Sequence, residues 1–316
     1  MKKMMLSQYG DVDVMHLVDV DRPTPADHQI LVKTTAIGVN DPDIAIRAHG
    51  PFPTMPKKLK PVLPHSLGQD FSGIVAAVGS AVQRFAVGDH VVGMAFMHTY
   101  AEYILLDDSA LVATVPQDLD LIPLGGFLLG TATAYAATIR DGQAQAGQTI
   151  LVHGGAGGVG SQAIQLAKST GATVIATGSA QQADFMQALG ADKTIDYQTQ
   201  DFTKLVANLD LVVNLTGPKT LANSYQVVKK GGRITSVNAL IDPIKTRLRG
   251  ITGTYSKGML SVEELNQLVD LYRQGKLTVP VDQEYPFELA AIQQAHRDFQ
   301  SGGNTGKKII VFQDQD

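Results

Sequence analysis

The segment Thr149–Ser169, TILVHGGAGGVGSQAIQLAKS, constrains the fold of this 316-residue chain more than any other. An apolar run leads into five glycines within seven residues, and a helical pattern follows. Gly155, Gly157 and Gly160 have the G-x-G-x-x-G spacing of a dinucleotide-binding loop, in which backbone amides at a helix N-terminus must approach a diphosphate closely. A glycine-rich loop without a ligand would show the same spacing. The strand before it and the helix after it are what predict dinucleotide binding.

From Pro123 onward, apolar strand patterns alternate with amphipathic helical patterns. We expect strands at 149–153, 173–177, 211–215 and 233–237, and helices at 159–169, 183–189 and 221–228. This βαβα order predicts an α/β fold with a doubly wound parallel sheet of the Rossmann type.

The first part of the chain is instead dominated by short strand patterns, expected at 29–40, 71–78, 90–94, 103–106 and 111–115. Five prolines between 51 and 64 predict an irregular surface loop. Near the end, a capping box formed by Ser261 and Glu264 predicts a helix that stops at Gly275. A helix at 289–299 and a strand at 307–312 then follow. We expect these last pieces to complete the N-terminal β region, which makes 1–121 and 259–316 one discontinuous domain and 122–258 the dinucleotide-binding domain.

Composition excludes several classes of function. The net charge is −4 and no basic stripe is present, which argues against a nucleic-acid partner and favours a small-molecule substrate. The absence of cysteine removes disulfides, thiolate nucleophiles and cysteine-bound zinc, and fits a reducing cytoplasm. The N-terminus has no apolar stretch of signal-peptide length, and about 18 apolar residues do not run together anywhere in the sequence. We therefore expect neither export nor a membrane span.

The end of the second Rossmann strand indicates which cofactor is used. An NAD enzyme normally places an acid there against the ribose 2′-hydroxyl, whereas this chain has Thr177, Gly178, Ser179 and an alanine. Without a carboxylate to repel it, a 2′-phosphate can be accepted, so NADPH is favoured over NADH. Because no Arg or Lys lies between 178 and 186, the positive charge must come from elsewhere, and Lys193 is the candidate.

Ordered motifs along nearly the whole chain resemble the zinc-independent quinone oxidoreductases of the medium-chain dehydrogenase/reductase superfamily. These motifs are AIGVNDPDIAIR (36–47), LGQDFSGIVAAVGSAVQRFAVGDHVVG (67–93), TYAEY (99–103), TATAYAA (131–137), the HGGAGGVG loop, LGADKTIDY (189–197) and SGGNTGKKIIVF (301–312). The resemblance implies a GroES-like β domain made from both chain ends, a Rossmann domain between them, an active cleft at their junction and a homodimer. It also implies an NADPH-dependent enzyme that reduces a quinone or an α,β-unsaturated carbonyl compound.

The same resemblance separates the chain from zinc alcohol dehydrogenases, whose catalytic zinc is held by a cysteine, a His-Glu pair and a further ligand. Asn40 and the pair Gln69 and Asp70 stand at the matching positions, so we expect no metal. Without a metal, charge that spreads through an enolate or an aromatic ring is easier to stabilise than charge on one alkoxide. A quinone or an enone is therefore the expected acceptor.

By resemblance, Asn40 offers its side-chain amide to the developing oxyanion, and Asp43 orients the cleft. An asparagine in a turn after Gly38 is the alternative interpretation of Asn40. The expected cofactor-binding residues are Thr133, Gly155, Ala156, Gly157, Gly158, Val159, Gly160, Thr177, Gly178, Ser179, Tyr197, Thr216, Val237 and Asn238.

Two residues depart from the family's motifs, and the identity of the proton donor is also open. Ala45 replaces an aromatic residue of several quinone reductases, and the lysine that often follows the second Rossmann strand is absent. His65, His98 and His153 lie near motifs, and each is either a general acid or a structural residue. The alternatives are an enoyl-thioester reductase, which needs a basic channel that the sequence does not reveal, and a non-catalytic NADPH sensor or structural protein.

Overall fold

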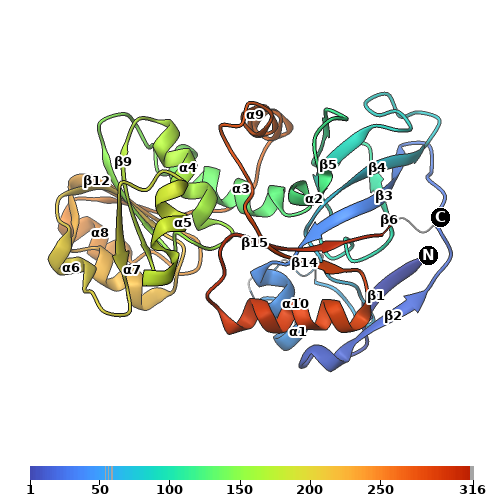
Figure 1. Cartoon of the computed structure of the whole chain (residues 1–316), viewed down its shortest axis with the longest axis horizontal. Helices are drawn as coiled ribbons and strands as arrows, with labels where there is room; N and C mark the ends of the chain where they lie inside the picture. The colour runs from blue at the N-terminus through green and yellow to red at the C-terminus, as the bar shows by residue number, and fades with distance from the viewer. Residues whose placement is uncertain (54, 56, 58–59, 314–316) are drawn as a thin grey trace.

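The computed structural model describes residues 1–53, 55, 57 and 60–313. Positions 54, 56, 58 and 59 of the predicted proline-rich loop, and the last three residues of the predicted segment 259–316, lie outside the described residues. The molecule contains two large sheets, and helix α3 (Phe127–Tyr135) lies between them (Figure 1).

The first large sheet has six strands in the order β10-β9-β8-β11-β12-β13, and every neighbouring pair is parallel. Its strands are β8 (Thr149–His153), β9 (Thr173–Gly178), β10 (Lys193–Asp196), β11 (Leu209–Asn214), β12 (Val228–Ser236) and β13 (Thr252–Tyr255). The connecting helices are α4 (Gly160–Ser169), η4 (Ala180–Gln182), α5 (Ala183–Ala188), α6 (Phe202–Leu205), α7 (Pro218–Ser224) and α8 (Pro243–Arg249). The order reverses between β8 and β11, so right-handed crossovers put helices on opposite faces. The predicted doubly wound sheet is confirmed.

The central strand β8 shows why this sequence forms such a sheet. Ile150, Leu151 and Val152 have no exposed surface, as expected for a parallel strand that is covered on both faces. Its parallel neighbours β9 and β11 hold it in register over its length.

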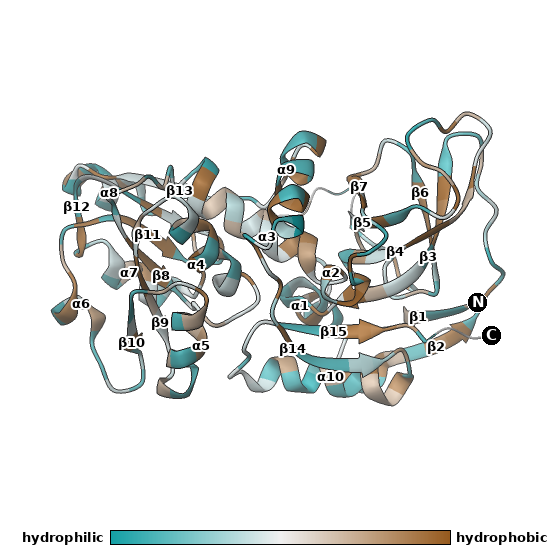
Figure 2. Ribbon diagram, turned by 45° about the horizontal axis from the view of Figure 1, so that its top comes forward, coloured by the Kyte–Doolittle hydropathy of each residue, from teal (hydrophilic) through white to brown (hydrophobic). Residues whose placement is uncertain are grey.

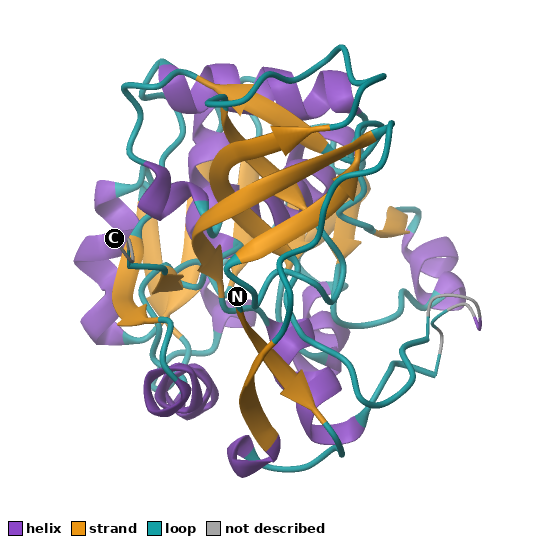
Figure 3. Cartoon of the chain, turned by 90° about the vertical axis from the view of Figure 1, so that its right-hand side faces the viewer, coloured by secondary structure: helices purple, strands orange, loops and turns teal. Residues whose placement is uncertain are grey.

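The second large sheet combines the two ends of the chain, in the order β14-β15-β3-β4-β5-β7, with β6 also paired to β3. Its strands are β3 (Gln29–Gly38), β4 (Asp70–Val78), β5 (His90–Met94), β6 (Tyr103–Asp107), β7 (Val112–Val115), β14 (Val281–Pro286) and β15 (Lys307–Val311). Strand β15 pairs antiparallel with β3, which joins the C-terminal segment to the N-terminal one. The N-terminus and the last strand, β15, both lie on the side of this sheet (Figures 1 and 3). The domain limits near 121 and 259 stay a prediction.

Other elements surround or connect the two sheets. They are β1 (Lys2–Leu6), η1 (Val12–Val14), β2 (Met15–Asp19), α1 (Asp41–His49), α2 (Leu121–Leu124), η3 (Ala136–Arg140), α9 (Val262–Arg273) and α10 (Leu289–Ser301). Helix α3 is largely apolar along its length (Figure 2), and several of its buried residues belong to one core cluster with residues of both large sheets. No helix among the described residues is long and apolar enough to cross a bilayer.

Several predicted elements need correction. The helix expected at 221–228 is wrong in its limits, because α7 starts at Pro218 and Val228 already belongs to β12. Pro218 favours the first turn of a helix, where its missing N–H costs nothing. The strand expected at 29–40 ends at Gly38, and helix α1, for which Asn40 is the N-cap, was not predicted. By contrast, the capping box of α9 is confirmed, with Ser261 N donating to the Glu264 carboxylate and Glu264 N donating to Ser261 Oγ.

Candidate active site

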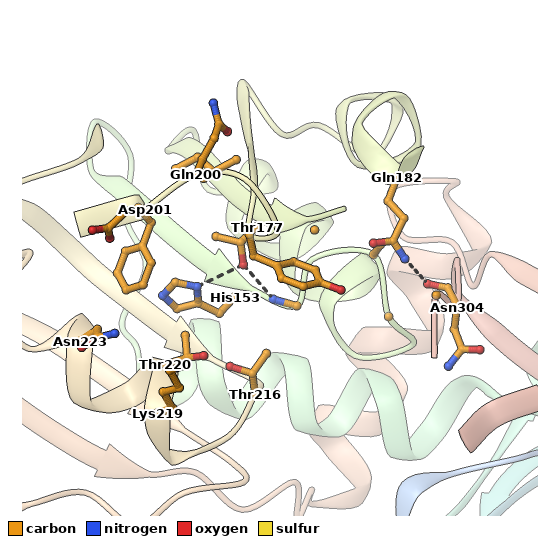
Figure 4. A pocket seen from close by; sticks show the side chains of 18 residues that line it. His153, Thr177, Gln182, Gln200, Asp201, Thr216, Lys219, Thr220, Asn223 and Asn304 are labelled. Atoms are coloured by element: carbon orange, nitrogen blue, oxygen red, sulfur yellow. Dashed lines mark hydrogen bonds between the residues drawn. The ribbon is translucent and has the colours of Figure 1, made fainter. Parts of the chain in front are cut away.

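A cavity of about 610 Å³ opens at the carboxyl ends of β8, β9 and β11, where the strand order reverses (Figure 4). Doubly wound sheets bind their ligands at this place. The cavity is lined by His153, Gly154, Ala156, Gly157, Thr177, Gly178, Gln182, Ile195, Tyr197, Gln200, Asp201, Phe202, Thr216, Lys219, Thr220, Asn223, Gly303 and Asn304.

The glycines of the loop 154–160 serve different purposes. Gly154 has a φ of +74°, which favours glycine, and a Cβ on Gly160 would collide with the Gly154 carbonyl oxygen. A Cβ on Gly155 would lie 2.9 Å from Ala176 Cβ, inside the core. Only Gly157 both lines the cavity and would give an added Cβ no neighbour closer than 3.7 Å. The open side at Gly157, next to the N-terminus of α4, fits a diphosphate.

His153, at the end of β8, belongs to an ordered chain of hydrogen bonds below the cavity. Ser224 Oγ donates to Thr220 O over 2.8 Å, so it must accept from His153 Nε2 over 3.1 Å. The other ring nitrogen, Nδ1, is then an acceptor for Thr177 Oγ1, also over 3.1 Å. Burial lowers the pKa of His153 to about 3, and the ring is neutral. The structural interpretation of this histidine is therefore favoured over a general acid.

The part of the cavity beyond β9 lacks the expected cation. Ser179 N donates to Gln182 Oε1 over 2.9 Å. Figure 4 shows the next bond, in which Gln182 Nε2 donates to Asn304 O over 2.9 Å. Lys193 is exposed on β10 and is not among the residues that line the cavity. Lys219 does line it, and it has no hydrogen-bond or ion-pair partner within the part of the chain that the structure describes.

Lys219, Gln182 and Asn304 are among the lining residues that sequence reasoning missed. Lys219 follows a Gly-Pro pair directly after a Rossmann strand, a signal that a charge search at strand ends would have found. Gln182 and Asn304 carried no such signal, because they meet only in the folded chain, 122 positions apart.

A second polar cluster lies at the junction of the two sheets. Asn40 Nδ2 donates to Asp70 Oδ1 over 2.8 Å and to Gly38 O over 3.1 Å, while Asn40 Oδ1 accepts from Lys307 Nζ. Asp70 also accepts from the backbone N–H of Leu129 over 3.1 Å. The side chains of Asn40, Asp70 and Lys307 are all buried.

Asp43 holds this cluster to the neighbouring loop. Its carboxylate accepts from Asn40 N over 2.9 Å and from Gly68 N over 3.0 Å. Burial, followed by the nearby charge of Asp70, raises the pKa of Asp43 to about 7. Through these two contacts, Asp43 positions Asn40 and the loop at Gly68.

The structure divides the predicted site residues into two groups. Six line the cavity, namely Ala156, Gly157, Thr177, Gly178, Tyr197 and Thr216. The others lie outside its lining, namely Asn40, Asp43, Thr133, Gly155, Gly158, Val159, Gly160, Ser179, Val237 and Asn238. Thr133 Oγ1 donates to Leu129 O over 2.8 Å, and Asn238 Nδ2 donates to Leu215 O over 3.1 Å. The roles of all these residues stay predictions.

No group of three or more His, Asp or Glu side chains suited to a metal ion occurs among the described residues. His65 Nδ1 lies 2.7 Å from Ser66 O, so it carries a hydrogen that points at the backbone. Burial lowers the pKa of His98.

Comparison with known proteins agrees with this architecture. Residues 26–144 match the model of the alcohol dehydrogenase GroES-like domain, and residues 189–310 match a zinc-binding dehydrogenase model. The quinone oxidoreductase of Sus scrofa is 31% identical over 99% of this chain and 98% of its own. The NADPH-dependent alkenal/one oxidoreductase of Arabidopsis thaliana is 31% identical over 98% of this chain and 79% of its own.

Solved structures agree as well. The quinone oxidoreductase of Coxiella burnetii has a TM-score of 0.88 and 31% identity, and 99% of each chain is covered. The quinone oxidoreductase of Escherichia coli complexed with NADPH has a TM-score of 0.88 and 26% identity, over 98% of this chain and all of the other. The chain therefore belongs to the zinc-independent quinone oxidoreductase branch of the medium-chain dehydrogenase/reductase superfamily.

Proposed function

We propose that this protein is an NADPH-dependent oxidoreductase that transfers a hydride to a quinone or an α,β-unsaturated carbonyl compound. The observation that carries the proposal is the cavity at the strand reversal, bordered by the 154–160 loop, in a chain whose full-length relatives are named quinone oxidoreductase and alkenal/one oxidoreductase. NADPH is the cofactor bound in the Escherichia coli relative.

The chain's own residues fit this cofactor. The first turn of α4 and the open side of Gly157 would hold the diphosphate, and Lys219 would supply the positive charge for the 2′-phosphate. When bound, NADPH supplies the hydride.

Asn40 and Asp43 are the proposed residues on the substrate side. Both hydrogens of Asn40 Nδ2 already have acceptors, and the bond to Gly38 O is the longer one at 3.1 Å. A negatively charged substrate oxygen is a stronger acceptor than that neutral carbonyl, so it can displace it as charge develops. Asp43, which binds the Asn40 backbone, keeps the donor in place.

The test is a turnover assay with purified protein. We expect oxidation of NADPH with small quinones or enones at an undiminished rate in the presence of a chelator. Turnover with acyl thioesters alone would favour the enoyl-thioester reductase. Tight NADPH binding without turnover across the panel would favour the sensor, and calorimetry without binding of either coenzyme would end the proposal.

We also propose a cytoplasmic homodimer. Strand β13 is an edge of the six-stranded sheet, and beside it Leu240, Ile244 and Leu248 are 81%, 69% and 80% exposed. Ile244 and Leu248 are four residues apart on α8 and share one face. An open sheet edge flanked by exposed apolar side chains favours pairing with a second copy. The absence of cysteine suits a reducing compartment.

A further inference from the structure

The side chain of Lys307, the first residue of β15, runs through a narrow space between three glycines. Lys307 is only 5% exposed. An added Cβ would lie 2.6 Å from its Cδ at Gly158, 2.8 Å from its Cε at Gly126, and 3.2 Å from its Cε at Gly38. These glycines belong to the dinucleotide loop, the start of α3 and the end of β3. The lysine stem thus touches both large parts of the fold where they meet.

The ammonium group at the end of this side chain acts on Asn40. Lys307 Nζ donates to Asn40 Oδ1, and Asp70 Oδ1 accepts from Asn40 Nδ2 over 2.8 Å. A flipped amide would turn its NH₂ toward the ammonium and its oxygen toward the carboxylate. Both contacts would be repulsive, and a buried charge without a partner is costly. The charged pair therefore permits one orientation of the amide.

The same lysine is tied to the cofactor loop. Gly306 N, directly before Lys307, donates to Ala156 O over 2.8 Å, and the lysine stem packs on Gly158. One short segment thus places the Asn40 amide and the 154–160 loop relative to each other.

We propose that Lys307 is a positioning residue for hydride transfer, which holds the Asn40 amide in its donating orientation at a fixed place relative to the cofactor loop. This inference rests on the proposed reductase function. Hydride transfer depends steeply on such placement, because a displacement of about 1 Å can cost on the order of 100-fold in rate.

The neighbouring lysine is a matched control. Lys308 is 6% exposed, lies in the same strand and pairs with Asp282 over 2.7 Å, away from Asn40. Lys307→Met and Lys308→Met both remove one buried charge. A general effect on stability should appear in both variants, and an effect through Asn40 should appear only in the first.

The experiment measures kcat with a saturating quinone, the Kd of NADPH, and the isotope effect with NADPH deuterated at the transferred position. We expect Lys307→Met to lower kcat about tenfold or more, to raise the isotope effect, and to change the Kd less than about threefold. Lys308→Met should keep kcat within about twofold. An unchanged kcat in Lys307→Met, or a weaker Kd with kcat intact, would overturn the inference; the latter result would make Lys307 a coenzyme ligand.

Two further measurements distinguish a failure of this inference from a failure of the proposed reductase function. In ¹⁵N spectra, the side-chain amide signal of Asn40, assigned by its loss in Asn40→Leu, should move in Lys307→Met and not in Lys308→Met. In a double-mutant cycle, Lys307→Met should lower kcat little further when Asn40→Leu is already present. If the two fold-losses in kcat multiply instead, Lys307 does not act through Asn40. If Lys307→Met does not fold, Lys307→Gln is measured in the same way. A wild-type protein without turnover would refute the proposed function, while the amide signal would still report on the orientation of Asn40.

Discussion

At the scale of single residues, the glycine loop shows that one motif combines different physical tasks. Gly160 allows α4 to begin against the Gly154 carbonyl, Gly158 leaves room for Lys307, and Gly157 faces the cavity. Only the last of these positions is free for a ligand. The motif spacing predicts the loop, but it does not distinguish packing glycines from a binding glycine.

Alanine substitutions should separate these tasks. Gly160→Ala should lower the free energy of unfolding by about 1–3 kcal/mol, because its Cβ collides with backbone. Gly157→Ala should leave stability nearly unchanged and weaken NADPH binding about tenfold, because its Cβ enters the space of the diphosphate. Urea denaturation and fluorescence titration measure the two effects. Equal losses of stability in both variants would contradict this assignment.

Lys219 should determine the preference for NADPH over NADH. Lys219→Ala should weaken NADPH binding about tenfold and leave NADH binding nearly unchanged, because a charge-assisted hydrogen bond to the 2′-phosphate is lost. Lys193→Ala is the control, since Lys193 lies outside the cavity lining. If only Lys193→Ala reduces the ratio of the two affinities, the cation expected from the sequence is the correct one.

At the scale of elements, side chains join segments that the sequence pattern treats separately. His153 links the end of β8 to Thr177 at β9 and to Ser224 at the end of α7. Thr177 Oγ1 also accepts from Gly154 N over 3.3 Å, so the chain of hydrogen bonds continues into the loop. These bonds fix the floor of the cavity before any ligand arrives.

Because His153 is buried and neutral, the stability of the folded protein should decrease in acid. The pKa of His153 is about 3 in the folded protein, below its ordinary value of 6.5, so the folded state favours the neutral ring. Its stabilising contribution is present above pH 6.5 and is lost as the pH falls toward 3. His153→Gln does not titrate and should reduce proton uptake on unfolding by about one in this range. The check is urea denaturation from pH 4 to 7, and an unchanged pH slope would contradict a buried neutral histidine.

At the scale of the whole molecule, α3 lies between the two large sheets (Figure 1), and β13 is the edge strand of the parallel sheet opposite β10. The substrate-side cluster and the cofactor cavity therefore belong to different parts of the fold. The proposed dimer would extend the parallel sheet beyond β13.

A charge on the apolar face of α8 should break the dimer. Leu248→Glu should shift the mass in light scattering from twice 33.7 kDa toward that value, because the carboxylate would be buried between copies. Val87→Glu is the control, since Val87 is 64% exposed and belongs to the turn between β4 and β5. A wild-type mass of one chain would refute the dimer.

The sequence by itself determined the parallel sheet, the strand, loop and helix around the glycines, and the capped start of α9. These features depend on local periodicity and turn chemistry, which neighbouring residues specify. It missed α1, because Asn40 and Pro42 suit a turn as well as a helix start.

Only the tertiary structure decided which polar groups meet. Lys307 reaches Asn40 across 267 positions because β15 pairs with β3, and no local pattern encodes that pairing. Lys219 rather than Lys193 lines the cavity because α7 starts beside the carboxyl ends of the strands, whereas Lys193 is the first residue of β10, at its amino end. The free energy of such contacts comes from burial and charge across distant segments, so their partners are defined only once the chain has folded.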